Sequence, residues 1–364
     1  KSGRKNAKAH LITSRNGKGD CKMGQSKTDV ETYEVTLEPS GKTIEVKEGQ
    51  TLLDAAIRNG IQVAYGCRHG SCSACKCQVL DGEYEIMDRV SEYSLMSFER
   101  DEGITLMCST IAESDLVIEV EEEESDLPFF AVHDFAAEVI ENEQCTGDIH
   151  IIKLKLSEPE SIEYAAGQFF EFEIPGLEED TRAYSLANKY KDDSTLEFHV
   201  KRINEGKGSN YMCDLQVGDQ VTGSGPYGTM QLRDRDKDLI LVAGGSGMAP
   251  IKSLVEELFS EDFEKEAWFF YGARTVKDLY LTEEWEALAS KYPNFHFVPA
   301  LSNADPSEEW GGETGFIADV IGRKLEKAIN ADAYLCGPPI MIETTCDQLY
   351  KLGVKGTDIF YDEF

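Results

Sequence analysis

The sequence predicts a multidomain chain with a small α+β domain, an antiparallel β-barrel and an α/β domain built on a parallel sheet. Three observations lead to this fold class. The length of 364 residues exceeds that of one ordinary domain. Short strands separated by Gly and Pro turns fill residues 128–232. Strands alternate with helical patterns over residues 233–364.

The first domain is expected over residues 32–124. Residues 33–37 and 43–46 alternate apolar and polar side chains around a Pro-Ser-Gly turn, which predicts a β-hairpin. A helix is predicted over residues 51–60, begun by Thr51 and ended by Gly60. Further strands are predicted at residues 77–80 and 116–120. The acidic run that follows, residues 121–126, is typical of a solvated linker and marks the first boundary.

Four cysteines give this domain its most specific signal. Cys67, Cys72 and Cys75 have the spacing C-x4-C-x2-C, and Cys108 follows after a long gap. This is the plant-type ferredoxin pattern, in which four thiolates bind a [2Fe–2S] cluster. Small residues between the cysteines let backbone N–H groups approach the sulfurs. We therefore predict a [2Fe–2S] site held by these four residues.

Other interpretations of the cysteines fit less well. A zinc site usually has two C-x2-C pairs or a Cys pair with a His pair, and no second pair follows here. A Rieske centre needs two His ligands, and a disulfide framework suits small secreted chains. Cys77 alternates away from Cys75 on a predicted strand, so we expect it to be a packed thiol.

The barrel, residues 128–232, is expected to bind a flavin. Its strands are predicted at residues 130–132, 150–156, 168–174, 196–200 and 220–223. In the motif R-x-Y-S, Arg182 can bind a pyrophosphate, Tyr184 can stack on a flat ring and Ser185 can hydrogen-bond a flavin nitrogen. Alone the motif could be a surface Arg–Tyr pair. Gly206–Ser209 strengthens the interpretation, because a Gly-Ser turn that opens a helix favours phosphate. Together the two motifs predict FAD.

The last domain, residues 233–364, is expected to bind a nicotinamide nucleotide. Parallel strands are predicted at residues 239–243, 268–271, 296–301 and 333–336. Gly244, Gly245 and Gly247 follow the first of these strands and precede a helix, the geometry of a dinucleotide site. The pattern is not G-x-G-x-x-G, so a tight strand-to-helix turn is the alternative. Cys336–Pro338 ends another strand at the same sheet edge, where Cys336 is either near the nicotinamide or a core residue.

The net charge of −32 is unevenly distributed. Residues 1–28 carry eight Lys or Arg and one Asp, whereas the remainder carries −39. We expect the basic tail, residues 1–31, to be disordered, and it has no apolar segment typical of a secretory signal. The acidic surface is expected to repel nucleic acid and membranes and to attract a partner with a basic docking face. Solubility alone and a halophilic origin are the alternatives. No apolar run is long enough for a transmembrane helix, and the cysteine use favours a reducing, cytoplasmic compartment.

The order of these motifs resembles the reductase components of bacterial multicomponent oxygenases, especially those of soluble diiron monooxygenases. Its flavin and nicotinamide parts resemble the ferredoxin–NADP reductase superfamily. The resemblance covers residues 32–364 and includes Tyr271–Arg274 and the ending Phe360–Phe364. It implies a β-grasp ferredoxin domain. It also implies that electrons pass from NADH to FAD, then to the [2Fe–2S] cluster and on to an oxygenase hydroxylase component, with the reductase itself expected to be monomeric.

The resemblance also implies roles for individual residues. Ser185, Cys336 and Phe364 are expected at the reacting rings, with Phe364 shielding the flavin. The cofactor-binding residues are expected to be Arg182, Ala183, Tyr184, Ser185, Val200, Gly206, Gly208, Ser209, Gly244, Gly245, Gly247, Gly337 and Pro338.

Three alternatives remain open at this point. The partner could be an aromatic-ring dioxygenase with a Rieske centre, or a sugar dehydratase, because the motifs would be the same. The third alternative is a pure electron carrier that has lost nicotinamide turnover, although the intact Arg182–Ser185 and Gly244–Gly247 motifs argue against it. NADH is expected over NADPH, because Arg274 has no neighbouring basic cluster to bind a 2′-phosphate.

Overall fold

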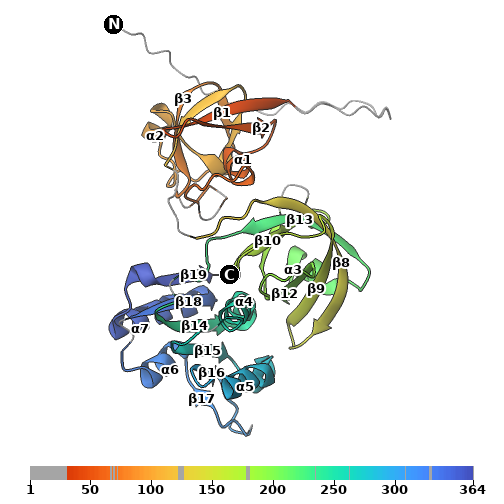
Figure 1. Ribbon diagram of the computed structural model, residues 1–364, viewed down its shortest axis with the longest axis vertical. Helices are drawn as coiled ribbons and strands as arrows, with labels where there is room; N and C mark the ends of the chain where they lie inside the picture. The colour runs from red at the N-terminus through yellow and green to blue at the C-terminus, as the bar shows by residue number, and fades with distance from the viewer. Residues whose placement is uncertain are drawn as a thin grey trace. The chain divides into compact units, whose positions relative to one another are not determined.

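The computed structural model describes residues 31–363 except 66, 67, 69, 72, 122–126, 178–180, 234, 262, 308, 328 and 329, and the side chain of residue 363. The predicted basic tail therefore lies, apart from residue 31, outside the described residues. The chain forms two compact units, Lys1–Ala131 and Val132–Phe364. Each is described by itself (Figure 1).

The first unit begins with the predicted hairpin. Strands β1 (Thr32–Glu38) and β2 (Lys42–Lys47) pair antiparallel, with Val35 opposite Ile44. Both side chains are buried. Along each strand, the residues next to these buried positions are more exposed, as a half-buried strand requires. Helix α1 (Leu52–Arg58) begins where predicted, because the Thr51 hydroxyl accepts the Asp54 N–H at 3.2 Å.

One mixed sheet and helix α1 make up the core of this unit. The sheet has the order β2-β1-β7-β3-β5, with β3 at Lys76–Asp81, β5 at Ile104–Leu106 and β7 at Leu116–Glu119. Strand β7 runs parallel to β1 and antiparallel to β3. A smaller pair, β4 (Tyr84–Ile86) with β6 (Thr110–Ala112), and the short helix α2 (Ser97–Asp101) complete the unit. The predicted α+β fold of the β-grasp type is confirmed.

The second unit starts with a six-stranded antiparallel barrel. Its order is β11-β10-β13-β8-β9-β12. The bounds are β8 His133–Gln144, β9 Ile149–Glu158, β10 Phe169–Phe172, β11 Arg182–Ser185, β12 Thr195–Lys201 and β13 Gln220–Tyr227. A bridge between Leu186 and Phe198 brings the two end strands together, so the barrel is nearly closed. Helix α3 (Lys207–Asp214) lies between β12 and β13 in the chain. The predicted barrel is confirmed.

One predicted barrel strand, at residues 130–132, is wrong. The strand begins instead at His133, whose partner is Gly225 of β13. Within the described part of the chain, the apolar residues before His133 have no strand to pair with, and an apolar run becomes a strand only where a partner supplies hydrogen bonds.

The rest of the second unit is a parallel sheet of order β17-β16-β15-β14-β18-β19. The four predicted strands are β14 (Asp238–Gly244), β15 (Ala267–Ala273), β16 (Phe295–Leu301) and β18 (Ala331–Gly337). The edge strands β17 (Glu313–Thr314) and β19 (Ile359–Glu363) were not predicted. Helices α4 (Met248–Leu258) and α5 (Thr282–Lys291) cover one face, and α6 (Ile317–Lys324) and α7 (Pro339–Leu352) cover the other.

The order of this sheet creates a crevice that suits a nucleotide. The chain passes from β14 outward through β15 and β16, then returns to β18 on the other side of β14. The carboxyl ends of β14 and β18 are therefore the topological switch point, where parallel α/β sheets bind ligands. Among the described residues no helix is long and apolar enough to cross a membrane.

Barrel and sheet share a contact at Gly167, which precedes β10. Its N–H donates to the Ser253 hydroxyl of α4 at 2.9 Å, and its φ is +90°. A Cβ at this position would overlap the Met230 carbonyl oxygen. This glycine is therefore required both by its backbone conformation and by the close approach of another segment.

We expect Gly167→Ala to destabilise the second unit by about 3 kcal/mol, because backbone strain and a steric clash add. Thermal unfolding should show Tm lower by roughly 10 °C. Gly176→Ala is the matched control, since its φ is +81° but no atom lies within 4 Å of the added Cβ. Gly176→Ala should lower the free energy of unfolding by only about 1 kcal/mol. Equal losses in the two variants would contradict the role given to the Met230 contact.

Candidate functional site

A pocket of about 570 Å³ lies in the second unit where the barrel meets the first turn of α4. It draws residues from β10, β11, β12, the start of α3, the glycine loop after β14, and β19. The lining residues are Phe169, Arg182, Ala183, Tyr184, Ser185, His199, Lys201, Ile203, Gly206, Lys207, Gly208, Ser209, Ser246, Ala249 and Asp362. All four residues of the predicted R-x-Y-S motif are among them.

Strand β11 and the start of α3 form one wall of the pocket. A Cβ on Gly208 would lie 2.6 Å from Arg182 Cγ and 3.3 Å from the Tyr184 hydroxyl. Only a glycine therefore lets the helix approach the Arg and Tyr side chains this closely. Burial raises the pKa of Tyr184, whose ring packs edge-on to Phe172. The Ser185 hydroxyl makes no hydrogen bond with the residues that the structure describes, which leaves it available to a ligand.

The first turn of α3 offers backbone donors and positive charge to this pocket. The N-cap residue, Gly206, has no side chain to cap the helix, so the first N–H groups are left for a ligand. Lys201 and Lys207 line the pocket beside them. The Ser209 hydroxyl is already used, because it accepts the Ile203 N–H at 3.1 Å. An uncapped helix N-terminus with two lysines fits the phosphates of FAD.

The glycine loop after β14 packs tightly against the end of β18. A Cβ on Gly247 would overlap the Cys336 carbonyl, and one on Gly244 would lie 2.7 Å from Met341 Sδ. These two glycines, with Gly337, let the two strand ends approach each other. Gly245 differs, because its φ is +57° and no atom lies within 4 Å of an added Cβ. The open space at Gly245 and the adjacent Ser246 in the pocket wall fit a nucleotide at this loop.

Seven residues predicted for the flavin and nicotinamide sites that the structure describes do not line the pocket: Val200, Gly244, Gly245, Gly247, Cys336, Gly337 and Pro338. Val200 is fully buried in the barrel core, because successive residues of β12 face opposite sides and its neighbours His199 and Lys201 take the pocket side. Any contact of Val200 with a cofactor is left to its main chain. Cys336 is also fully buried, with its sulfur 3.6 Å from Met230 Sδ. Pro338 precedes α7 at the end of β18.

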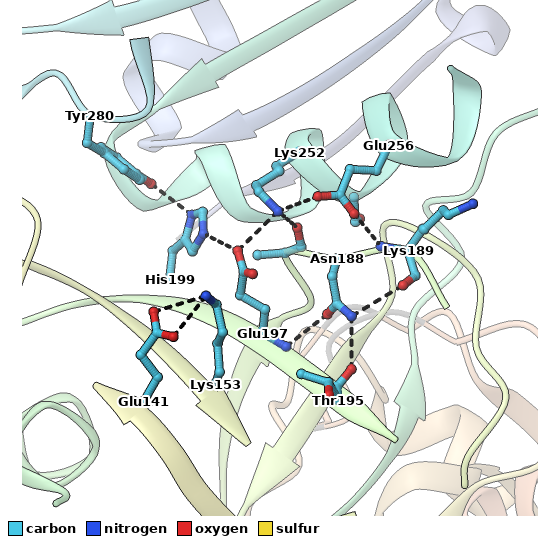
Figure 2. Close-up of polar contacts among 12 residues, drawn as sticks. Glu141, Lys153, Asn188, Lys189, Thr195, Glu197, His199, Lys252, Glu256 and Tyr280 are labelled. Carbon is cyan, nitrogen blue, oxygen red and sulfur yellow. Dashed lines mark hydrogen bonds and ion pairs between the residues drawn. The ribbon is translucent and has the colours of Figure 1, made fainter. Parts of the chain in front are cut away.

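A buried ion pair joins the barrel to α4 beside the pocket (Figure 2). Lys252 Nζ of α4 lies 3.1 Å from Glu197 Oε1 of β12 and 2.5 Å from Glu256 Oε1. It also donates to the Ala187 carbonyl at 3.0 Å. The Lys252 side chain is only 9% exposed. The ammonium thus has three acceptors, which is what a buried cation requires.

The ion pair continues through a histidine and a tyrosine to the glycine loop. His199 Nε2 lies 3.0 Å from Glu197 Oε1, and His199 Nδ1 lies 3.1 Å from the Tyr280 hydroxyl. The Tyr280 hydroxyl in turn donates to the Gly245 carbonyl at 3.3 Å. These contacts form a continuous path through the protein interior from the pocket wall to the nucleotide loop.

Burial and charge oppose each other in this network. Burial would raise the pKa of Glu197, but the hydrogen bond from His199 and the charge of Lys252 lower it to about 2. Burial lowers the pKa of His199, against the pull of Glu197. Burial would lower the pKa of Lys252, but the charges of Glu197 and Glu256 raise it. The carboxylate and the ammonium are thus both charged at neutral pH.

Sequence reasoning missed several residues of this region, among them His199, Lys201, Lys252 and Asp362. The alternation of β12 could have indicated the first two, because polar residues on a predicted barrel strand mark its outer face. Asp362 lies opposite Cys336 on β19, and burial raises the pKa of its carboxyl to about 6. Nothing in the local sequence signals that Lys252, on an otherwise apolar helix face, meets a carboxylate of the barrel.

In the first unit, Cys75 and Cys108 are described, whereas Cys67 and Cys72 lie outside the described residues. Cys75 immediately precedes β3, Cys108 lies in the short 3-10 helix Met107–Ser109 after β5, and both thiols are buried. Hydrogen bonding with Cys75 and Ser109 and the nearby Arg89 lower the pKa of Cys108 to about 6, despite burial. The thiolate, the form that binds iron, is therefore favoured at this position.

Cys77 provides a contrast two residues along β3. Burial raises its pKa to about 12, so it remains a neutral thiol in the core. The prediction that Cys77 is a packed thiol is confirmed. Cys75 and Cys108, the two predicted ligands that the structure describes, therefore fit an iron–sulfur cluster.

Comparison with known protein families gives the same three parts. Residues 35–113 match the 2Fe-2S iron-sulfur cluster binding domain, residues 136–232 the oxidoreductase FAD-binding domain, and residues 241–347 the oxidoreductase NAD-binding domain. The predicted cofactors, a [2Fe–2S] cluster, FAD and a nicotinamide nucleotide, are thereby confirmed.

Two relatives match nearly the whole chain. Phenol hydroxylase P5 protein of Acinetobacter pittii is 39% identical over 92% of this chain and 94% of its own length. The propane 2-monooxygenase reductase component of Mycolicibacterium goodii is 35% identical over 92% of this chain and 97% of its own.

Two solved structures have the same architecture. The Amycolatopsis reductase GcoB is 30% identical, with a TM-score of 0.81 over 92% of this chain and 99% of its own. The ferredoxin reductase in carbazole 1,9a-dioxygenase is 29% identical, with a TM-score of 0.77 over 92% of this chain and 98% of its own.

These matches confirm the predicted fold class and the predicted oxidoreductase activity, in which electrons pass from NADH through FAD to a [2Fe–2S] cluster. The chain belongs to the family of reductase components that join a ferredoxin domain to FAD- and NAD-binding domains, the family of the phenol and propane monooxygenase reductases.

Proposed function

We propose that this protein oxidises NADH and delivers the electrons to the hydroxylase component of a multicomponent monooxygenase of the phenol or alkane type. The observation that carries the proposal is the shared pocket, because the R-x-Y-S residues and Ser246 of the nucleotide loop line the same space. A flavin ring and a nicotinamide ring bound there would be in reach of each other. Bound nicotinamide, flavin and cluster supply the hydride and single-electron chemistry, and the protein sets their positions.

The choice of partner rests on the relatives. The phenol hydroxylase relative is 39% identical, whereas the toluate 1,2-dioxygenase electron transfer component of Pseudomonas putida is 30% identical over 88% of this chain. A dioxygenase partner is therefore the second candidate. A sugar dehydratase partner has no support among these relatives. A pure electron carrier is disfavoured by the intact pocket.

Within the pocket we assign the flavin to the barrel wall. Arg182 pairs with the pyrophosphate, Tyr184 stacks on a ring, and the Ser185 hydroxyl donates to the flavin. Gly206 and Gly208 admit the phosphates to the uncapped turn of α3. Ala183 contributes its main chain, and Ser209 shapes the turn through its bond to Ile203.

We assign the nicotinamide nucleotide to the carboxyl ends of β14 and β18. Gly244, Gly247, Gly337 and Pro338 shape that edge, and Gly245 leaves room for the ligand. Cys336 is assigned to the same edge, where this buried residue packs against Gly247 of the loop. Phe364 is assigned to shield the flavin by resemblance alone, because it lies outside the described residues.

Four further assignments complete the proposal. Cys67, Cys72, Cys75 and Cys108 bind the cluster. The domains comprise residues 32–124, 128–232 and 233–364, after a basic tail at residues 1–31. The reductase is monomeric and meets a basic docking face on its partner. A reducing, cytoplasmic location is supported by the free thiols of the seven described cysteines.

We expect anaerobic NADH to bleach the flavin and produce the EPR signal of a reduced [2Fe–2S] cluster. Cys75→Ser and Cys108→Ser should lose the EPR signal while the flavin still bleaches, because each removes a thiolate ligand. Cys77→Ala is the matched control and should keep both signals. Loss of the cluster in the control alone would overturn the ligand assignment.

We expect Arg182→Gln to weaken FAD binding by roughly 10–100-fold, because a charge-assisted bond to the pyrophosphate is lost. The measurement is the dissociation constant of FAD from the apoprotein, followed by flavin fluorescence. Arg235→Gln is the control, since Arg235 pairs with Glu257 and Glu261. Unchanged FAD affinity in Arg182→Gln would remove Arg182 from the site.

We expect KM for NADPH to exceed KM for NADH by about tenfold or more, because a 2′-phosphate without a cationic partner loses about 1.4 kcal/mol of binding or more. Steady-state assays with ferricyanide compare the two nucleotides. A lower KM for NADPH than for NADH would contradict this prediction.

A further inference from the structure

Three large apolar side chains stand exposed on the first unit within six residues. Tyr93 is 92% exposed, Met96 49% and Phe98 58%. We call these three residues the apolar patch. Their neighbours Ser94 and Leu95 are each only 1% exposed, so their buried side chains hold the segment against the rest of the unit. Aromatic residues and Met are the types enriched at the centres of protein interfaces, and a local group of them in the open is unusual on a surface.

The segment that carries the apolar patch is hydrogen-bonded, through Ser91 and Ser94, to the loop that contains the cluster cysteines. The Ser91 N–H and the Ser94 hydroxyl both donate to the Gly70 carbonyl, at 3.1 and 2.5 Å. The Ser73 hydroxyl donates to the Ser94 carbonyl at 2.9 Å. Gly70 and Ser73 lie inside the C-x4-C-x2-C loop. The patch segment therefore sits against the cluster-binding loop.

Helix α2 is attached to the same loop at a further point. Lys76, the residue after Cys75, forms an ion pair with Glu99 of α2 at 2.6 Å. The Glu99 carboxylate also accepts the Met96 N–H at 2.9 Å, which fixes the start of the helix. The orientation of Met96 and Phe98 is thus tied to the position of a predicted cluster ligand.

Acidic residues accompany the apolar patch. Glu92 precedes Tyr93, and Asp101 and Glu102 follow Phe98 at the spacings that share a helix face. All three acidic side chains are exposed. An apolar centre with an acidic border is complementary to a protein surface with an apolar centre and a basic border.

Charge also indicates which protein meets the patch. Residues 31–131 contain 22 acidic and 7 basic residues, a net charge of −15. Residues 132–364 contain 44 acidic and 21 basic residues, a net charge of −23. Because the flavin-binding unit carries charge of the same sign, complementarity favours a separate basic protein over this chain's own second unit.

We propose that Tyr93, Met96 and Phe98 form the docking surface through which the reductase passes electrons from its cluster to a separate protein with a basic rim. The inference rests on the proposed function and specifies where the partner binds. Electron-transfer complexes use small interfaces and electrostatic steering, and three apolar side chains with acidic neighbours match that size and charge.

The experiment uses the full-length holoprotein and cytochrome c as the probe, because cytochrome c is a basic protein that accepts single electrons. The test variant is Tyr93→Ser with Phe98→Ser. The matched control is Val217→Ser, which removes an apolar residue that is 68% exposed on the second unit. Three rates are measured: NADH oxidation with ferricyanide, appearance of the cluster EPR signal after rapid mixing with NADH, and cytochrome c reduction.

We expect the double variant to raise KM for cytochrome c by about tenfold, as the loss of central interface residues does. Its ferricyanide rate and its rate of cluster reduction should match those of the wild type, and Val217→Ser should match in all three. Glu92→Lys should weaken the salt dependence of cytochrome c reduction, because it removes an attractive charge.

Two results would overturn the inference. Equal KM values for cytochrome c in the double variant and the wild type would show that the patch does not dock a partner. Slower cluster reduction by NADH in the double variant would assign the patch to this chain's own flavin unit. Failure of NADH to reduce the flavin of the wild-type protein would instead contradict the proposed function, so the two failures are distinguishable.

Discussion

The arrangement of the second unit depends on the buried ammonium of Lys252. It is the point where helix α4 of the parallel sheet meets strand β12 and the segment after β11 of the barrel. A charge removed from water in this way is costly unless its acceptors are in place, and breaking one partner of such a pair costs about 3–5 kcal/mol. The pair therefore penalises any arrangement in which barrel and sheet separate. That constraint holds the flavin wall and the nucleotide loop around one pocket.

The first unit follows a different principle, because its site is local in sequence. Three of the four predicted cluster ligands lie within nine residues, and the loop between them is fixed by Ser94, Ser91 and Glu99 from the segment that follows β4. The lowered pKa of Cys108 and the raised pKa of Cys77 show how finely position decides the state of a thiol. Hydrogen bonds and Arg89 lower the pKa of Cys108, whereas burial alone raises the pKa of Cys77.

Sequence reasoning succeeded where the signal is carried by adjacent residues. The C-x4-C-x2-C run, the R-x-Y-S motif and the glycine loop each lie within a few consecutive residues, so their chemistry can be predicted without knowing the fold. It failed where the signal depends on pairing between distant segments. The strand at residues 130–132 lacked a partner, and β19 became a strand only because β18 lies beside it. Lys252 and His199 belong to the site through contacts with residues 55 and 81 positions away, and no local pattern encodes such contacts.

The chain of contacts from Glu197 to Gly245 has more acceptors than protons. A neutral imidazole and a phenol together have two protons to donate, while the three contacts along this path would use three. A carboxylate can only accept, so the imidazole proton belongs on Nε2 and Nδ1 must itself accept. The Tyr280 hydroxyl has one proton, which it can donate either to His199 Nδ1 or to the Gly245 carbonyl. If Tyr280 donates to Gly245, His199 Nδ1 lacks a donor among the described residues. If it donates to His199 instead, the Gly245 carbonyl keeps, within the described part of the chain, only its bond from the Met248 N–H.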